Sequence, residues 1–140
     1  EVIRAEFSHH PMVPQFQVGT LNKECPESFP ACETLPIHWD QEEEWYVFYD
    51  SPRKKGSHIV YTLDETDMVM SGVRKDGTLQ DKDFGMSDDH PIAWYNCVGK
   101  GKAFYSALGH KAYYYKSQNY NRLLTEAVNW AGNPLQNCTL

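Results

Sequence analysis

The chain has 140 residues, a mass of 16.2 kDa and a formal net charge of −6 at pH 7. This length suits a single domain over residues 1–140. A composition with 41% hydrophobic and 14% aromatic residues is typical of a globular protein. The acidic balance excludes nucleic acid as the expected partner, because a polyanion needs a concentrated basic surface. No apolar run approaches the ~20 residues of a membrane-spanning helix. No signal peptide is recognisable, and the sequence leaves the compartment open between cytoplasmic and secreted or periplasmic.

The first 36 residues predict little regular structure. Residues 1–7 read as the end of a helix. Apolar and polar side chains alternate over 14–21, which predicts a half-buried strand. Four prolines between positions 14 and 36 keep elements short, so 22–36 is expected to be loop or broken helix.

The middle of the chain predicts short strands. Residues 45–49 and 59–63 are rich in aromatic and β-branched side chains, and the turn-like stretch between them predicts a hairpin with antiparallel pairing. A further short strand is expected within 68–73. The polar, Asp-rich stretch 76–89 is the best candidate for a mobile loop.

The last third gives the clearest pattern. Residues 92–97 and 103–108 predict two strands joined by a glycine-containing turn, and the second is apolar enough to be covered on both faces. After a possible N-cap at Ser117, apolar residues recur at helical spacing until Gly132 and Pro134 end the helix; they are Tyr120, Leu123, Leu124, Ala127, Val128 and Ala131. This order of strand, loop and covering helix brings the loop at Gly109-His110 to the carboxyl end of a strand, where α/β sheets bind ligands.

Four cysteines are present, and their spacing fits neither a zinc finger nor a thioredoxin motif. Cys25 and Cys32 bracket a short loop and can form a disulfide if the protein is secreted, although three connectivities are open. Cys97 falls in a predicted strand, where we expect a buried, unreactive thiol.

Four segments, in this order and spread over nearly the whole chain, resemble ThuA-like (trehalose-utilisation) proteins. They are F-x-x-H-P at 7–11, F-P-x-x-x-x-L-P at 29–36, E-E-W-Y at 43–46, and a closing segment with HPIAW at 90–94, G-x-G-x-x-F-Y-x-A-L-G-H at 99–110 and N-W-A-G at 129–132. Two features depart from the family pattern: Phe29 stands where the family usually has His, and the family's first half is not matched.

The resemblance implies an α/β, flavodoxin-like fold related to class I glutamine amidotransferases, and a role in carbohydrate metabolism. Only the C-terminal part of that fold is expected, with a mixed, largely antiparallel sheet and a C-terminal helix. Amidotransferase activity is not expected, because no cysteine precedes a predicted helix at a strained strand-to-helix turn.

Three histidines occupy turn or strand-end positions that coincide with the resemblance: His10, His90 and His110. Together with Glu44 (or its neighbour Glu43) and Tyr46 they can form an acid/base site or hold a divalent metal such as zinc. The alternative is that His-Pro pairs only shape loops and that His110 caps a carbonyl. The catalytic candidates are His110, His90, Glu44 and Tyr46; the substrate-binding candidates are His10, Trp94 and Tyr113; and the metal candidates are His10, His90 and His110.

The leading hypothesis is a domain that binds or processes a disaccharide or keto-sugar in a His/Glu/Tyr-lined cleft. The alternative is a non-catalytic half-domain that binds a ligand or a partner protein. We also expect a homo-oligomer, because one helix covers one sheet face and a bare apolar face exceeds the few hundred Å² that soluble monomers tolerate.

Overall fold

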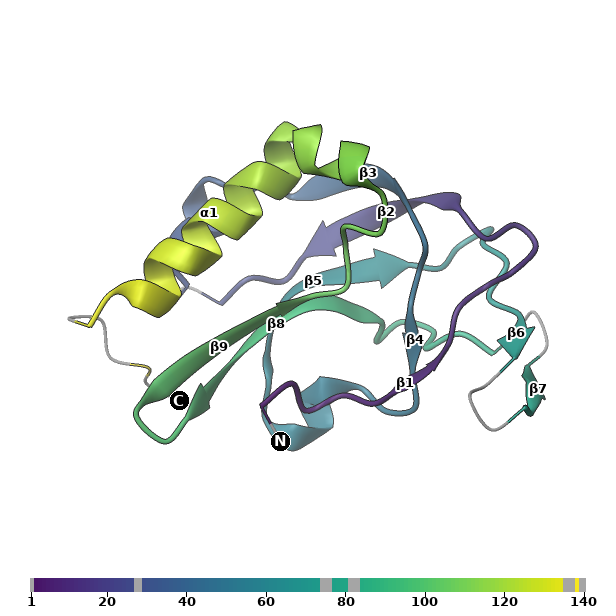
Figure 1. Ribbon diagram of the computed structural model, residues 1–140, viewed down its shortest axis with the longest axis horizontal. Coiled ribbons are helices and arrows are strands. Elements are labelled where there is room, and N and C mark those ends of the chain that lie inside the picture. Colours follow the sequence, from purple (N-terminus) through teal and green to yellow (C-terminus); the bar gives the residue numbers. More distant parts are fainter. Residues whose placement is uncertain (1, 27–28, 74–76, 81–83, 135–137, 139–140) are drawn as a thin grey trace.

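The computed structural model describes residues 2–26, 29–73, 77–80, 84–134 and 138. Its centre is a five-stranded sheet in the order β3-β2-β5-β8-β9, with helix α1 lying across one face (Figure 1). The sheet strands are β2 (Gln17–Lys23), β3 (His38–Glu43), β5 (His58–Asp64), β8 (Pro91–Val98) and β9 (Gly101–Ser106), and α1 is Gln118–Gly132.

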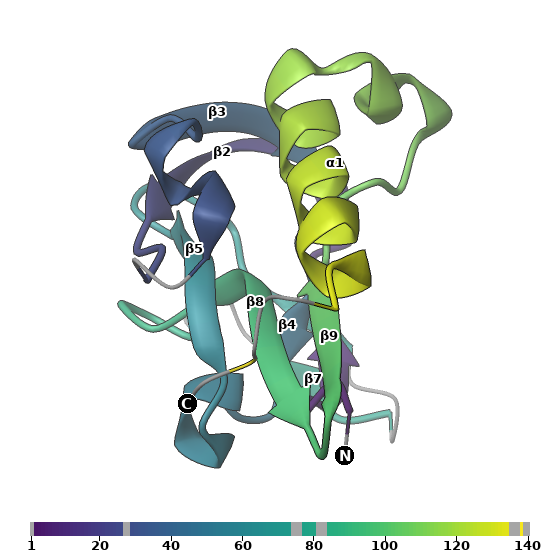
Figure 2. The ribbon, with the colours of Figure 1, turned by 90° about the vertical axis from the view of Figure 1, so that its left-hand side faces the viewer.

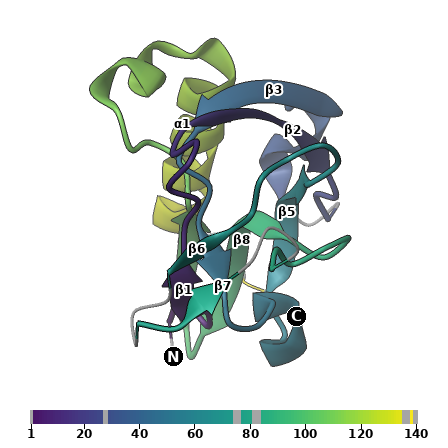
Figure 3. The same cartoon turned by 90° about the vertical axis from the view of Figure 1, so that its right-hand side faces the viewer.

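Smaller elements surround this sheet. β1 (Phe7–His9) pairs with β4 (Val47–Phe48), and β6 (Gly72–Val73) pairs with β7 (Leu79–Gln80); the short 3-10 helices are η1 (Pro30–Glu33), η2 (Pro52–Lys55) and η3 (Ala112–Lys116). Figure 3 shows β1, β6 and β7 gathered at one end of the molecule. Every strand pairing between described residues is antiparallel. The antiparallel sheet and C-terminal helix are therefore as expected for this α/β chain, and the flavodoxin-like relationship stays a prediction.

Helix α1 begins where its sequence predicts. The Ser117 hydroxyl caps it by accepting the Tyr120 N–H at 3.4 Å, and the helix ends at Gly132. Leu123 and Trp130 are buried against the sheet, whereas Val128, which the spacing placed on the apolar stripe, is 70% exposed. Seen from the side in Figure 2, β2 and β3 curve toward the beginning of α1.

The core under α1 is aromatic. Phe29 stacks on Tyr95 and Phe104 with ring centroids 5.5 and 5.7 Å apart, and Trp130 meets its edge at 5.6 Å. Phe29 is 1% exposed. The position where ThuA-like proteins usually carry His therefore serves packing in this chain.

The opposite sheet face is covered by the chain's own N-terminal segment and β4. Trp94 is fully buried there, with Phe48 edge-on at 5.4 Å, and its indole N–H donates to the Ile3 carbonyl at 2.8 Å. The side-chain amide of Asn96 likewise donates a hydrogen bond to the Val2 carbonyl at 2.8 Å. The expected helix end over 1–7 was wrong: residues 2–6 are not helical and lead into β1. The homo-oligomer was expected because one sheet face seemed uncovered, and in the described residues that face is covered. Self-association therefore stays a prediction, but this argument no longer supports it.

Strand pairing in the middle of the chain differs from the expectation. The hairpin between 45–49 and 59–63 was wrong, because β4 pairs with β1, while β5 lies between β2 and β8. β3 was not predicted at all, since its sequence HWDQEE carries one large apolar residue and an acidic run. The β8–β9 hairpin is confirmed, with a tight turn between Val98 and Gly101.

Part of the polar stretch predicted as a mobile loop, residues 76 and 81–83, lies outside the described residues; the stretch contains β7. No described helix is long and apolar enough to cross a bilayer.

All four cysteines are paired. Cys25 bonds Cys32, and Cys97 bonds Cys138, with Cα atoms 5.5 Å apart in each pair. The expectation of a free Cys97 thiol was therefore wrong. The second disulfide fastens the chain beyond α1 to the end of β8.

Candidate functional site

A buried carboxylate lies at the centre of the candidate site. Glu44 follows β3, and its side chain is 4% exposed. Its Oε1 accepts the Gln15 amide N–H at 2.5 Å and lies 3.4 Å from His10 Nδ1, while its Oε2 lies 2.9 Å from His110 Nδ1. Three segments far apart in the sequence thus converge on one carboxylate.

The strand pairings explain this convergence. The antiparallel pairing of β1 with β4 places His10, one residue after β1, beside the segment that follows β3. His110 arrives from the other direction, in the loop that leaves β9. The site therefore depends on contacts between sequence positions roughly 30 to 100 residues apart, a separation that follows from these residue numbers.

Glu43 fixes the His110 loop. Its fully buried carboxylate accepts the Gly109 N–H at 2.6 Å on Oε2, and the Glu44 and His110 N–H groups at 2.9 and 3.3 Å on Oε1. Burial raises the pKa of Glu43, and these N–H bonds offset part of that rise. Gly109 has φ +105°, and a Cβ there would lie 2.7 Å from the Tyr115 and Tyr120 hydroxyls, so this loop needs glycine.

Tyr46 adds a phenol beside the carboxylate. Its ring meets Phe7 edge-on at 5.1 Å and lies 6.2 Å from the His10 ring. Burial and then the charge of Glu44 raise the pKa of Tyr46. The phenol therefore keeps its proton and can donate a hydrogen bond.

An outer layer ties the loops together. Glu42 accepts hydrogen bonds from the Tyr113 hydroxyl, from the Tyr114 hydroxyl at 3.0 Å and from Lys111 Nζ at 3.3 Å, and these three donors lower the pKa of Glu42. Phe16 packs edge-on against His110 at 5.3 Å, with Lys111 Nζ 3.4 Å from its ring centroid. The loops that carry His10 and His110 are thus held to each other and to β3.

The structure separates the predicted residues into two groups. It brings His10, Glu44, Tyr46 and His110 together, with Tyr113 exposed nearby. His90 lies beneath them: it is fully buried, with Nε2 2.8 Å from the Tyr46 carbonyl and Nδ1 2.6 Å from Glu65 Oε1. It therefore supports the Tyr46 backbone and is not positioned to touch a ligand.

Trp94 also lies away from the site, in the core between the sheet and the N-terminal segment. Sequence reasoning missed Gln15, Phe16, Lys111 and Glu65. Gln15 and Phe16 sit at the start of a predicted strand, and Glu65 follows another, so nothing local marked them as parts of this site.

The metal expectation finds no support in the described residues. Among them, no group of three or more His, Cys, Asp or Glu side chains has the arrangement of a metal site. Both His90 nitrogens face protein partners, and the Nδ1 atoms of His10 and His110 face Glu44. The three histidines do not form a common ligand set.

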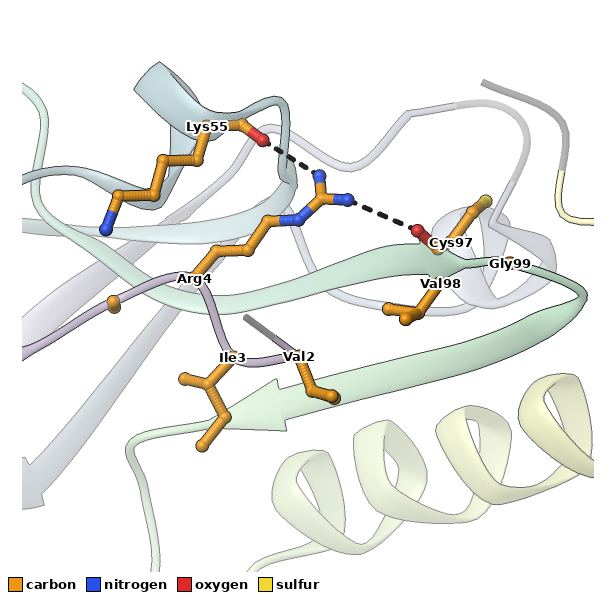
Figure 4. Close-up of a pocket in the computed structure, with 8 residues that line it drawn as sticks. Val2, Ile3, Arg4, Lys55, Cys97, Val98 and Gly99 are labelled. Carbon is orange, nitrogen blue, oxygen red and sulfur yellow. Dashed lines mark hydrogen bonds between the residues drawn. The ribbon is translucent and has the colours of Figure 1, made fainter.

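A large groove of about 850 Å³ lies elsewhere, between the N-terminal segment and the β8–β9 turn (Figure 4). Its central cation, Arg4, donates to the carbonyls of Lys55, Gly56 and Cys97 at 2.9, 3.0 and 3.2 Å. Most of its remaining lining is aliphatic. The residues that line the groove include no histidine or carboxylate. The cluster of His10, Gln15, Glu44, Tyr46 and His110, called the Glu44 cluster below, is therefore the better candidate for acid/base chemistry.

Comparison with known proteins agrees with the motifs. The ThuA family model, described as trehalose utilisation, matches residues 1–131, which include every residue of the Glu44 cluster. Searches of curated proteins and of solved structures gave no match. The chain belongs to the ThuA (trehalose utilisation) family.

Proposed function

We propose that this protein has a trehalose-utilisation-like role in which it binds a disaccharide or keto-sugar at the Glu44 cluster and processes it by proton transfer. The observation that carries the proposal is the contact of both His10 and His110, through Nδ1, with the two oxygens of Glu44. A carboxylate behind an imidazole orients the ring and stabilises its protonated form, which is the arrangement used in general acid–base catalysis.

The surroundings suit a polyhydroxylated ligand. His110 and His10 have side chains 40% and 26% exposed, so their rings reach solvent although Glu44 does not. Tyr46 supplies a hydroxyl, and the exposed ring of Tyr113 can pack against a sugar face. Polar groups next to aromatic rings are the usual lining of small-molecule sites.

Two other chemistries fit this cluster poorly. A glycosidase of the common kind needs two carboxyl groups facing the scissile bond, but Glu43 and Glu44 are buried and already accept hydrogen bonds from protein groups. A cysteine nucleophile is also lacking, since all four cysteines are in disulfides.

Saccharide binding is tested by calorimetric titration with trehalose, glucose and fructose. We expect at least one sugar to bind the wild-type protein and its affinity to fall by about 10-fold or more in His110→Ala, the loss of roughly one hydrogen bond to a charged group. His38→Ala is the matched control, because His38 is an exposed histidine on β3 that bonds Asn22 away from the cluster. Absence of binding to all three sugars, or equal loss in both variants, would contradict the proposal.

A further inference from the structure

The atoms next to Nδ1 in His10 and His110 indicate where the protons of these rings lie. His10 Nδ1 lies 3.0 Å from the Pro11 carbonyl oxygen, and a carbonyl oxygen only accepts, so Nδ1 carries a hydrogen. His110 Nδ1 lies 2.9 Å from Glu44 Oε2, and an ionised carboxylate likewise only accepts. In both neutral rings the basic lone pair is therefore on Nε2. Neither Nε2 has a hydrogen-bond partner within the described part of the chain.

One carboxylate contacts the Nδ1 atoms of both rings. His10 contacts Oε1 and His110 contacts Oε2 of the same Glu44. A ring that carries hydrogen on both nitrogens can act as an acid, and a neutral ring can act as a base through Nε2. The cluster thus places a candidate acid and a candidate base on the same carboxylate.

An acid and a base held together suit a reaction that removes a proton from one substrate atom and adds a proton to another. We propose that the Glu44 cluster catalyses proton transfer at a carbon adjacent to the carbonyl of a keto-sugar, interconverting it with its enediol. The inference rests on the proposed saccharide function and adds the reaction class to it.

The step balances without an oxidant or a reductant. Nε2 of the neutral imidazole takes the proton of the C–H bond next to the carbonyl. The electron pair of that bond forms the C=C bond, the C=O π pair moves to oxygen, and this oxygen takes a proton from Nε2 of the imidazolium. The two rings exchange protonation states, and the reverse step, on the same or the neighbouring carbon, restores them.

Neighbouring groups fit this step. The Tyr46 hydroxyl is hydrogen-bonded to the same carboxylate and helps to hold it in place. Gln15, which donates to Glu44 Oε1 at 2.5 Å, fixes the carboxylate without adding a charge.

The test is hydrogen–deuterium exchange in D2O, followed by proton NMR, with 1,3-dihydroxyacetone and D-fructose as probes. We expect the wild-type protein to speed the loss of the C–H signals next to the carbonyl above the rate in buffer. His10→Gln and His110→Gln should each lower this enhancement by about 100-fold or more, the usual contribution of a general acid or base. His38→Gln should match the wild-type protein.

A second measurement needs no variant. Glycolohydroxamate resembles the planar enediolate, so it should bind the wild-type protein about 100-fold more tightly than dihydroxyacetone, as transition-state analogues do. No exchange above the buffer rate, exchange that survives either substitution in a folded variant, or equal affinity for the two compounds would overturn the inference. If sugars still bind in that case, the proposed saccharide role survives and only the reaction class fails.

Discussion

Removing the Cys97–Cys138 disulfide should destabilise the protein far more than any single surface change. The bond joins the end of β8 to the chain beyond α1 and spans 41 residues. In the chain-entropy model, restoring the freedom of a loop of that length in the unfolded state costs about 4 kcal/mol of folding free energy. The Cys25–Cys32 bond spans 7 residues, and the same relation gives about 2.4 kcal/mol.

The measurement is urea unfolding, followed by tryptophan fluorescence, of Cys97→Ser/Cys138→Ser and of Cys25→Ser/Cys32→Ser as the matched control. Each variant keeps the other disulfide, so the two differ mainly in the length of the loop that is released. We expect both free energies of unfolding to fall, with the 97–138 variant lower by roughly 1.5 kcal/mol than the control. A 97–138 variant as stable as the control, or more stable, would refute the reasoning from loop length.

Two further predictions concern the carboxylates of Glu43 and Glu65. Glu43→Gln replaces one carboxylate oxygen by an amide NH2, which then faces an N–H of Gly109, Glu44 or His110. This loss of an acceptor should lower the free energy of unfolding by about 1–3 kcal/mol and weaken saccharide binding at His110. An unchanged urea midpoint and an unchanged affinity would contradict this. Burial raises the pKa of Glu65, but the hydrogen bond with His90 and the bonds from the Met86 and Ser87 N–H groups outweigh it, so the pKa lies below its ordinary value of 4.5. Its contribution to stability is therefore complete above about pH 4.5 and is lost as pH falls through the lowered pKa. Urea midpoints measured from pH 6 to pH 3 should drop less steeply in Glu65→Gln, and parallel curves would show that this carboxylate does not contribute.

The strongest sequence patterns were local ones. Helix α1 follows from its apolar spacing with Ser117 as cap, and the β8–β9 hairpin follows from two apolar runs around a glycine turn. Each of these elements forms between residues close in sequence, so its information lies within one window. The motif resemblance similarly singled out His10, Glu44, Tyr46 and His110.

Local sequence patterns did not determine the strand order or the disulfide pairing. β3 was missed because an edge strand needs few apolar residues, and its HWDQEE sequence is compatible with a solvated acidic run. The partner of Cys97 lies 41 residues away, and spacing alone leaves three connectivities for four cysteines. Such pairings depend on which surfaces meet after the sheet has formed.

The two histidines His90 and His110 illustrate the same limit at the site. Both adjoin a strand end and a backbone-shaping residue, Pro91 or Gly109, so both were equally good site candidates by sequence alone. His90 enters β8, which is flanked by β5 and β9, and is buried beneath the Tyr46 backbone, whereas His110 leaves edge strand β9 and reaches solvent beside Glu44. Whether a histidine faces a ligand or the core depends on the position of its strand in the sheet, and that position is set by long-range pairing that only the tertiary structure reveals.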